Sequence, residues 1–211
     1  MVITVGSAPA TRRAEVLAHR RSPAQHLRAE MEQGSTDAVR LREVPFLTQI
    51  ALRAVPGTPA SAALEAALGT RLPRQVGEVS EGPDGLRVLW LAPDEFLAVA
   101  PDEAGSGVRT TDHAGRLAKA LGDRPGQVVD VSANRTTLEL SGAVARSVLD
   151  KSCRLDLHPR AFPVGNAVAT HLGATPAVLW CTAEQTWQVM VRPSFATHVV
   201  RWLLDGMREY A

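Results

Sequence analysis

One hairpin-like pattern occurs twice in this sequence, and the repeat constrains the fold more than any other feature. Val88-Leu89-Trp90 is followed by a turn and a second strand-like run that ends at Pro101. Val178-Leu179-Trp180 begins the same pattern 90 residues further on, and this copy ends at Pro193. Similar units at a fixed offset are typical of a duplicated structure. The sequence therefore predicts a pseudo-duplicated α+β protein with two βαββ-type halves, in which helices cover antiparallel sheets.

Residues 1–45 differ from the rest of the chain, because no aromatic residue appears before Phe46. Ser22-Pro23-Ala24-Gln25 is typical of a capping box with proline at the first helical position. Leu27 and Met31 then form a thin apolar stripe at helical spacing. Such a thin stripe needs a surface to lie on, either in its own chain or in a partner. We predict an extended N-terminal arm with a short helix over residues 1–45, a first α+β half over 46–127 and a second over 128–211.

The predicted elements follow the same order in both halves. In the first half we expect a strand over 46–55, a helix over 58–68, a hairpin over 86–100 and a helix over 112–121. In the second half we expect strands over 128–132 and 136–142, a helix capped by Ser141, a hairpin over 176–193 and a helix over 194–205. One side of the last helix is predicted to carry Phe195, Val199, Trp202 and Leu203.

The bulk composition excludes several classes of partner. The formal net charge is +1, from 23 basic and 22 acidic residues, which gives no electrostatic footprint for nucleic acid or anionic lipid. No apolar run approaches the ~18 residues of a membrane span, and the N-terminus lacks the pattern of a signal peptide. Cys153 and Cys181 lie too far apart for a CxxC metal site. We expect a cytoplasmic protein with two reduced thiols that binds neither nucleic acid nor a membrane.

The common catalytic patterns are missing. The sequence contains no GxSxG elbow and no phosphate-binding loop, and its six histidines show no zinc-ligand spacing. Asp94-Glu95 and Asp102-Glu103 each follow a proline at the end of a strand, where carboxylates accept hydrogen bonds from backbone N–H groups in turns. We therefore predict no catalytic, cofactor-binding or metal-binding residue on this chain.

Residues 128–142, VVDVSANRTTLELSG, bring several polar groups together between two strands. Asp130 and Ser132 are typical of strand-end and turn residues whose side chains bond nearby backbone N–H groups. Arg135 begins the next strand, where it could pair with Asp130 or reach a partner.

The same stretch resembles the aminomethyltransferase (glycine cleavage T-protein) superfamily. In that superfamily an Asp-Val-Ser motif ends a strand, and a later glycine starts a helix with a leucine near its end. Asp130-Val131-Ser132, Gly142 and Leu149 hold these places within residues 130–151. The resemblance implies a T-protein-like, folate-binding-domain fold.

Folate-handling members of that superfamily carry a Gly-Gly-x-x-Asp-Asp stretch whose acid serves the transfer chemistry. The equivalent segment here, residues 165–176, contains no carboxylate. It therefore offers no group for proton transfer or for stabilising an iminium-like carbon. The departure implies that the fold was kept and the chemistry lost.

From about residue 20 to its end, the chain resembles one branch more specifically, the gamma subunits of heterotetrameric sarcosine oxidases. The most distinctive motif is Trp90-Leu91-Ala92-Pro93-Asp94-Glu95. The others are Arg21-Ser22-Pro23, residues 41–46, Asp130-Val131-Ser132 with Arg135, residues 159–165, and Arg192-Pro193-Ser194-Phe195-Ala196 with Trp202-Leu203.

That resemblance implies a non-catalytic structural or assembly subunit in a cytoplasmic complex of alpha, beta, gamma and delta subunits. The complex oxidises sarcosine to glycine and yields hydrogen peroxide with formaldehyde or methylene-tetrahydrofolate. The resemblance puts the FAD, FMN, NAD and tetrahydrofolate sites on the alpha and beta subunits, zinc on delta, and no cofactor on gamma. Two alternatives stay open: a gamma-type subunit of a complex that oxidises another N-methyl amino acid, and a stand-alone folate-binding aminomethyltransferase-like protein.

We also predict that the arm forms part of the partner interface, because its thin helix is flanked by arginines and needs a docking surface. The expected interface residues are Arg12, Arg13, Arg20, Arg21, Leu27, Met31 and Arg135.

Overall fold

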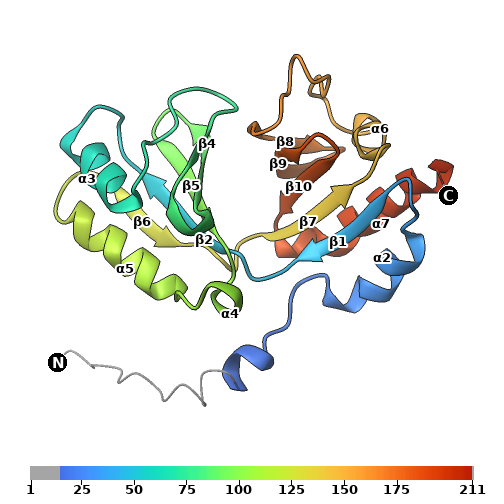
Figure 1. Cartoon of the computed structure of the whole chain (residues 1–211), viewed down its shortest axis with the longest axis horizontal. Helices are drawn as coiled ribbons and strands as arrows, with labels where there is room; N and C mark the ends of the chain where they lie inside the picture. Colours follow the sequence, from blue (N-terminus) through green and yellow to red (C-terminus); the bar gives the residue numbers. More distant parts are fainter. Residues whose placement is uncertain (1–14, 211) are drawn as a thin grey trace.

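The computed structural model describes residues 15–210 and contains two five-stranded antiparallel sheets (Figure 1). The first sheet has the order β3-β4-β5-β2-β6 and consists of β2 (Thr48–Arg53), β3 (Val79–Glu81), β4 (Arg87–Ala92), β5 (Glu95–Ala100) and β6 (Gln127–Asp130). The second has the order β1-β7-β10-β9-β8 and consists of β1 (Arg40–Val44), β7 (Thr136–Ser141), β8 (Ala167–Leu172), β9 (Thr175–Ala183) and β10 (Thr186–Val191).

Helices cover the outer face of each sheet. α3 (Pro59–Leu68) and α5 (Thr110–Leu121) cover the first sheet, and α2 (Arg28–Gly34), α6 (Ala145–Asp150) and α7 (Ala196–Met207) cover the second. The short α4 (Glu103–Ser106) has no buried residue. Four 3-10 turns complete the described elements: η1 (Gln25–Leu27), η2 (Pro83–Gly85), η3 (Pro193–Phe195) and η4 (Arg208–Tyr210). The predicted pseudo-duplicated α+β fold is confirmed, because the order strand, strand, helix, three strands, helix occurs in both halves.

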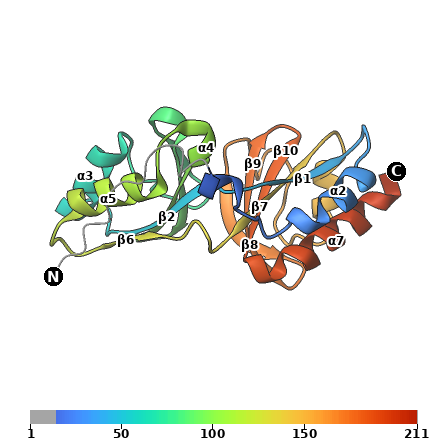
Figure 2. The same cartoon turned by 90° about the horizontal axis from the view of Figure 1, so that it is seen from below.

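The two halves exchange one edge strand each. β1 lies at the edge of the second sheet, paired with β7, while β6 lies at the edge of the first sheet, paired with β2. Figure 2 shows β1 beside the C-terminal elements and β6 beside the N-terminal ones. The division into halves at 46–127 and 128–211 stays a prediction. The topology adds that β1, which precedes the first half, completes the second sheet, and that β6, at the boundary between the halves, completes the first.

Three apolar clusters make up the core. The first sheet packs on α3 and α5 through residues such as Leu64, Phe96 and Leu117, and the second packs on α2, α6 and α7. The third cluster joins the inner faces of the two sheets and contains Leu89, Leu97, Val99, Ala167, Val178 and Met190. The sheets therefore face each other, and the helices lie outside.

Local signals decided which element ends could be predicted. α3 begins and ends as expected: Thr58 and Ser61 form a capping box, and Gly69 follows the helix with φ 71°. The prediction that Ser141 caps the next helix is wrong, because Ser141 ends β7 and α6 has Val144 at its N-cap. The helix predicted to begin at Asp112 begins two residues earlier, because α5 starts at Thr110 and Asp112 lies in its first turn.

The predicted side of the last helix is buried only in part, because Val199 and Leu203 lie in the core and Phe195 and Trp202 do not. The buried residues of α7 are Ala196, Val199, Val200, Leu203 and Met207. Phe195 and Trp202 are exposed instead. Strands β1, β3 and β8 were not predicted from the sequence.

Candidate interaction surface

The arm helix α2 lies on the chain's own second half, against α7 and β1 (Figure 1). Leu27 and Met31 keep only 1% and 3% of their surface exposed and belong to the core cluster of that half. The thin apolar stripe could lie on its own chain or on a partner, and in the structure it lies on its own chain. Neither side chain is available for contact with a partner, which corrects their place among the expected interface residues.

Glu43 of β1 holds the start of the arm in place. Its carboxylate accepts hydrogen bonds from the Ser22 hydroxyl, from the Ala24 backbone N–H at 3.0 Å and from the Thr136 hydroxyl of β7. The predicted capping box is wrong, because the Ser22 hydroxyl donates to Glu43 and the helical turn there has no side-chain cap. A carboxylate of β1 with two donors from the start of the arm and one from β7 fixes the arm against these two strands.

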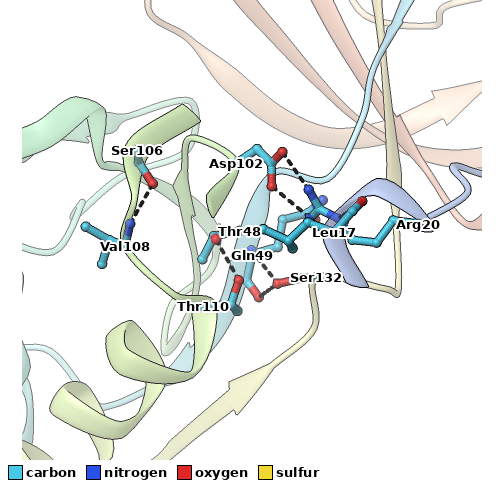
Figure 3. Close-up of polar contacts among 9 residues, drawn as sticks. All are labelled: Leu17, Arg20, Thr48, Gln49, Asp102, Ser106, Val108, Thr110 and Ser132. Atoms are coloured by element: carbon cyan, nitrogen blue, oxygen red, sulfur yellow. Dashed lines mark hydrogen bonds and ion pairs between the residues drawn. The ribbon is translucent and has the colours of Figure 1, made fainter. Parts of the chain in front are cut away.

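Arg20 connects the arm to the first half of the molecule (Figure 3). Its guanidinium donates to both carboxylate oxygens of Asp102, at 2.8 and 2.9 Å, and lies 4.2 Å from the ring centroid of Phe46. Because its hydrogen-bonding capacity is directed into its own chain, Arg20 acts here as an intramolecular clamp. Arg21 is exposed, and Arg12 and Arg13 lie outside the described residues.

The Asp130–Ser132 turn has the structural role expected from the sequence. Asp130 Oδ1 accepts hydrogen bonds from the Ser132 backbone N–H at 3.0 Å and from its hydroxyl at 2.7 Å. The Ser132 hydroxyl oxygen in turn accepts from the Gln49 N–H of β2 at 2.9 Å (Figure 3). The turn therefore binds the segment after β6 to the first sheet.

Arg135 lies half-buried in a cleft of ≈ 320 Å³ at one end of the second sheet, together with His171 and Arg192. It does not form the predicted alternative ion pair with Asp130, whose carboxylate bonds Ser132 instead. Burial and the neighbouring Arg192 lower the pKa of Arg135, and only Glu95 acts in the opposite direction. The cleft lining contains no carboxylate, as the acid-free segment 165–176 led us to expect.

The remaining chemistry-bearing groups are dispersed. Cys153 and Cys181 are free thiols, and burial raises the pKa of both. Within residues 15–210, no group of three or more His, Cys, Asp or Glu side chains is placed to hold a metal ion. No helix in the same range is long and apolar enough to cross a membrane.

The exposure of Trp202 was not predicted, because the sequence pattern placed it on one side of the last helix together with Val199 and Leu203, which are buried. The side chain is 49% exposed on α7, and its ring centroid lies 5.9 Å from that of His198. The register of the buried positions Val199, Leu203 and Met207 is the signal that could have placed Trp202 outside.

A solved structure of low sequence identity shows which class of fold the chain has. The solved glycine cleavage system aminomethyltransferase T from Bartonella henselae matches 83% of this chain and 48% of that chain, with a TM-score of 0.59 and 17% sequence identity. At this identity the likeness concerns the fold alone. The chain therefore has the predicted T-protein-like α+β fold.

More similar proteins define the family. Residues 53–209 match the family described as sarcosine oxidase, gamma subunit. The sarcosine oxidase subunit gamma of Arthrobacter sp is 58% identical over 91% of this chain and 92% of its own length, and that of Corynebacterium sp. (strain P-1) is 54% identical over the same shares. A chain of the solved heterotetrameric sarcosine oxidase from Corynebacterium sp. U-96, in complex with pyrrole 2-carboxylate, is 50% identical with a TM-score of 0.84 over 90% of this chain and 96% of that chain. The chain belongs to the sarcosine oxidase gamma subunit family, as its motifs predicted.

Proposed function

We propose that this chain is a non-catalytic structural subunit of a heterotetrameric sarcosine oxidase, which converts sarcosine to glycine by oxidative demethylation. The observation that carries the proposal is the likeness to sarcosine oxidase gamma subunits over nearly the full length of both chains.

The polar groups of the chain support a structural role. Asp130 and Ser132 hold a turn, Glu43 holds the arm, and Arg20 joins the arm to Asp102. Each of these groups directs its hydrogen bonds inside the chain, so none is left oriented towards a reacting atom.

The cofactor and partner assignments are part of the same proposal. FAD, FMN, NAD and tetrahydrofolate would be bound by the alpha and beta subunits and zinc by delta, in a cytoplasmic complex. The large alpha subunit is the expected main partner of this chain.

Co-expression with the three other subunits tests the proposal. A tag on this chain should capture a complex of four different subunits that contains flavin and produces hydrogen peroxide from sarcosine. Capture of this chain alone, as a monomer, would refute the subunit role. A complex that oxidises a different N-methyl amino acid and not sarcosine would refute the substrate.

The arm can be tested separately. Deleting residues 1–45 would remove β1 and part of the core, so it cannot report on an interface. Deleting residues 1–14 removes Arg12 and Arg13 without touching any described residue. We expect this shorter deletion, or Arg21→Gln, to lower the yield of complex while the melting temperature of the chain stays unchanged. The matched control is Arg208→Gln, outside the arm, whose side chain is also exposed and pairs with the exposed Asp205.

A further inference from the structure

Four of the residues that line the cleft around Arg135 form a single row that follows the register of β7, β10, β9 and β8. β7 and β10 pair with Thr136 opposite Val191, and continuing this register by one residue beyond both strand ends sets Arg135 opposite Arg192. β10 and β9 pair with Val191 opposite Ala177, which puts Arg192 opposite Pro176. Pro176 is paired in turn with His171 of β8. We call Arg135, Arg192, Pro176 and His171 the basic row.

The basic row lies on the inner face of the second sheet. Val178 and Met190, each two residues from a member of the row, belong to the cluster between the sheets and line the cleft. The cleft therefore has a basic rim and an apolar floor.

The charges in the row are uncompensated by the described part of the chain. No hydrogen bond or ion pair within residues 15–210 is formed by the guanidinium of Arg135 or of Arg192, whereas Arg20, Arg42 and Arg53 each reach a carboxylate. Glu95 is the acid that raises the pKa of Arg135, and its carboxylate is already paired with Arg53 at 3.1 Å.

Such an arrangement costs free energy in the isolated chain. Like charges directly opposite each other on neighbouring strands are destabilising, and a half-buried cation without a counter-ion lacks the pairing that offsets its desolvation. An anion placed between the two guanidiniums would remove both costs. The planar fork of arginine fits a carboxylate in a bidentate manner, and the apolar floor suits the methylene groups of an acidic side chain.

We propose that the basic row binds a carboxylate, and that in the assembled enzyme this carboxylate is an Asp or Glu side chain of a partner subunit. The proposal rests on the proposed function, because it names the chemistry by which a partner recognises this chain.

The test uses the four-subunit complex and two double variants. Arg135→Gln with Arg192→Gln removes the row's charges, and Arg154→Gln with Arg160→Gln removes the same charge from exposed positions of the same half, outside the cleft. Retention of this chain in the tagged complex is measured over a salt series. Truncating one side of a desolvated charge pair weakens binding by about 30-fold or more. We expect that loss for the row variant and less than about 3-fold for the control. Equal retention of both double variants would count against a partner's carboxylate.

A second arm distinguishes a partner side chain from a small molecule. The full chain alone is titrated with glutarate, against sodium chloride of the same ionic strength. Weak or absent glutarate binding, together with loss of the row variant from the complex, supports a partner's side chain as the source of the carboxylate. A micromolar dissociation constant that the row variant abolishes, with unchanged retention, keeps the carboxylate site but overturns the partner as its source. Equal retention and no glutarate binding overturn the proposal entirely.

Folding of the row variant is checked by its melting temperature, which should equal or exceed the wild-type value because a like-charge repulsion is removed. If the double variant misfolds, Arg192→Gln alone replaces it, since Arg192 is exposed. If even the wild-type chain is not retained in a complex, the proposed function fails, and the glutarate titration decides the carboxylate site by itself.

Discussion

The exchanged strands β1 and β6 pair at equivalent edges of their sheets. At each junction, where the exchanged strand begins to pair with its neighbour, one glycine is required, but the two glycines lie on different partners of the pair. In the second sheet, Arg40 lies opposite Ser141, so the incoming Val39 lies opposite Gly142 of the receiving segment. In the first sheet, Gln127 lies opposite Arg53, so the incoming Gly126 lies opposite Ala54. One half thus carries glycine on the receiving segment and the other on the incoming one.

Both glycines allow a close approach between backbones. A Cβ on Gly142 would lie 2.9 Å from the Val39 Cα and even nearer to the Ala38 carbonyl oxygen. A Cβ on Gly126 would lie 2.5 Å from the Arg53 carbonyl oxygen. The duplicated fold therefore requires one glycine at each junction, on either of the two paired segments. Because the two halves have it on different segments, an alignment of the two repeats does not match Gly126 with Gly142.

The halves also differ in what covers them. The core of the second half includes Ala24, Leu27, Met31, Val39 and Leu41, all from the N-terminal 45 residues. In the described part of the chain, the buried core of the first half runs from Ile50 to Leu121, with Val128 of β6 packed against it, and includes no residue of the arm. The arm is therefore an additional layer on one of two otherwise similar units.

The largest effect is expected from Gly142→Ala. Gly142 has φ 123°, so alanine would be strained there as well as in contact with the backbone before β1. The free energy of unfolding, measured in urea, should fall by about 4 kcal/mol.

Gly115→Ala is the control for that variant. Gly115 lies in α5, and a Cβ added there would meet no atom within 4 Å, so the free energy of unfolding should rise by about 0.5 to 1 kcal/mol. A loss below about 1 kcal/mol for Gly142→Ala would show that the junction can widen with little strain.

Leu27→Ala tests whether the arm is part of the second core. Leu27 is fully buried, so its truncation should lower the free energy of unfolding by about 3 kcal/mol. Gln25→Ala, an exposed change in the same turn, should cost less than about 0.5 kcal/mol. Equal effects would mean that the arm is detached from the core in solution.

Gly126→Ala should have a smaller effect than Gly142→Ala. Its backbone has no positive φ, and β6 is a short edge strand that can shift away from Arg53. We expect a loss of about 2 kcal/mol in the free energy of unfolding. A loss as large as that of Gly142→Ala would make the two junctions energetically equivalent.

The smallest effect is expected from Arg20→Ala. The ion pair with Asp102 is only partly buried and the Phe46 contact is modest, so the loss should be about 1 kcal/mol. Arg28→Ala removes an exposed pair with Glu32 and should change the free energy of unfolding by less than about 0.5 kcal/mol. High salt should reduce the difference in free energy of unfolding between Arg20→Ala and Arg28→Ala, because it screens the ion pair with Asp102.

Local signals in the sequence were enough to predict much of the fold. The Thr58-Pro59 start, the Gly69 end and both hairpins depend on neighbouring residues, and they were predicted correctly. The exchange of β1 and β6 was not predicted, because it depends on pairing between segments far apart in the chain. Ser22 failed as a cap because a distant carboxylate, that of Glu43, competes for its hydroxyl.

The cleft itself was not predicted, and only one of its residues was singled out from the sequence. Arg135 attracted attention because it follows a polar turn, whereas His171 and Arg192 carry no local pattern that relates them to it. They meet only through the register of four strands, which the sequence does not specify for β8. The absence of acids in residues 165–176 was visible beforehand, but the two facing arginines were not.

The strand exchange has a consequence for synthesis of the chain. β1 leaves the ribosome long before β7, the strand that pairs with it. At ~5–20 residues per second this delay is on the order of 5–20 seconds, during which the strand has no partner. Charged side chains protect unpaired strands from association with other chains. The sequence Arg40-Leu41-Arg42-Glu43 carries charges at three of four positions, so the nascent strand is poorly suited to aggregation until its own partner emerges.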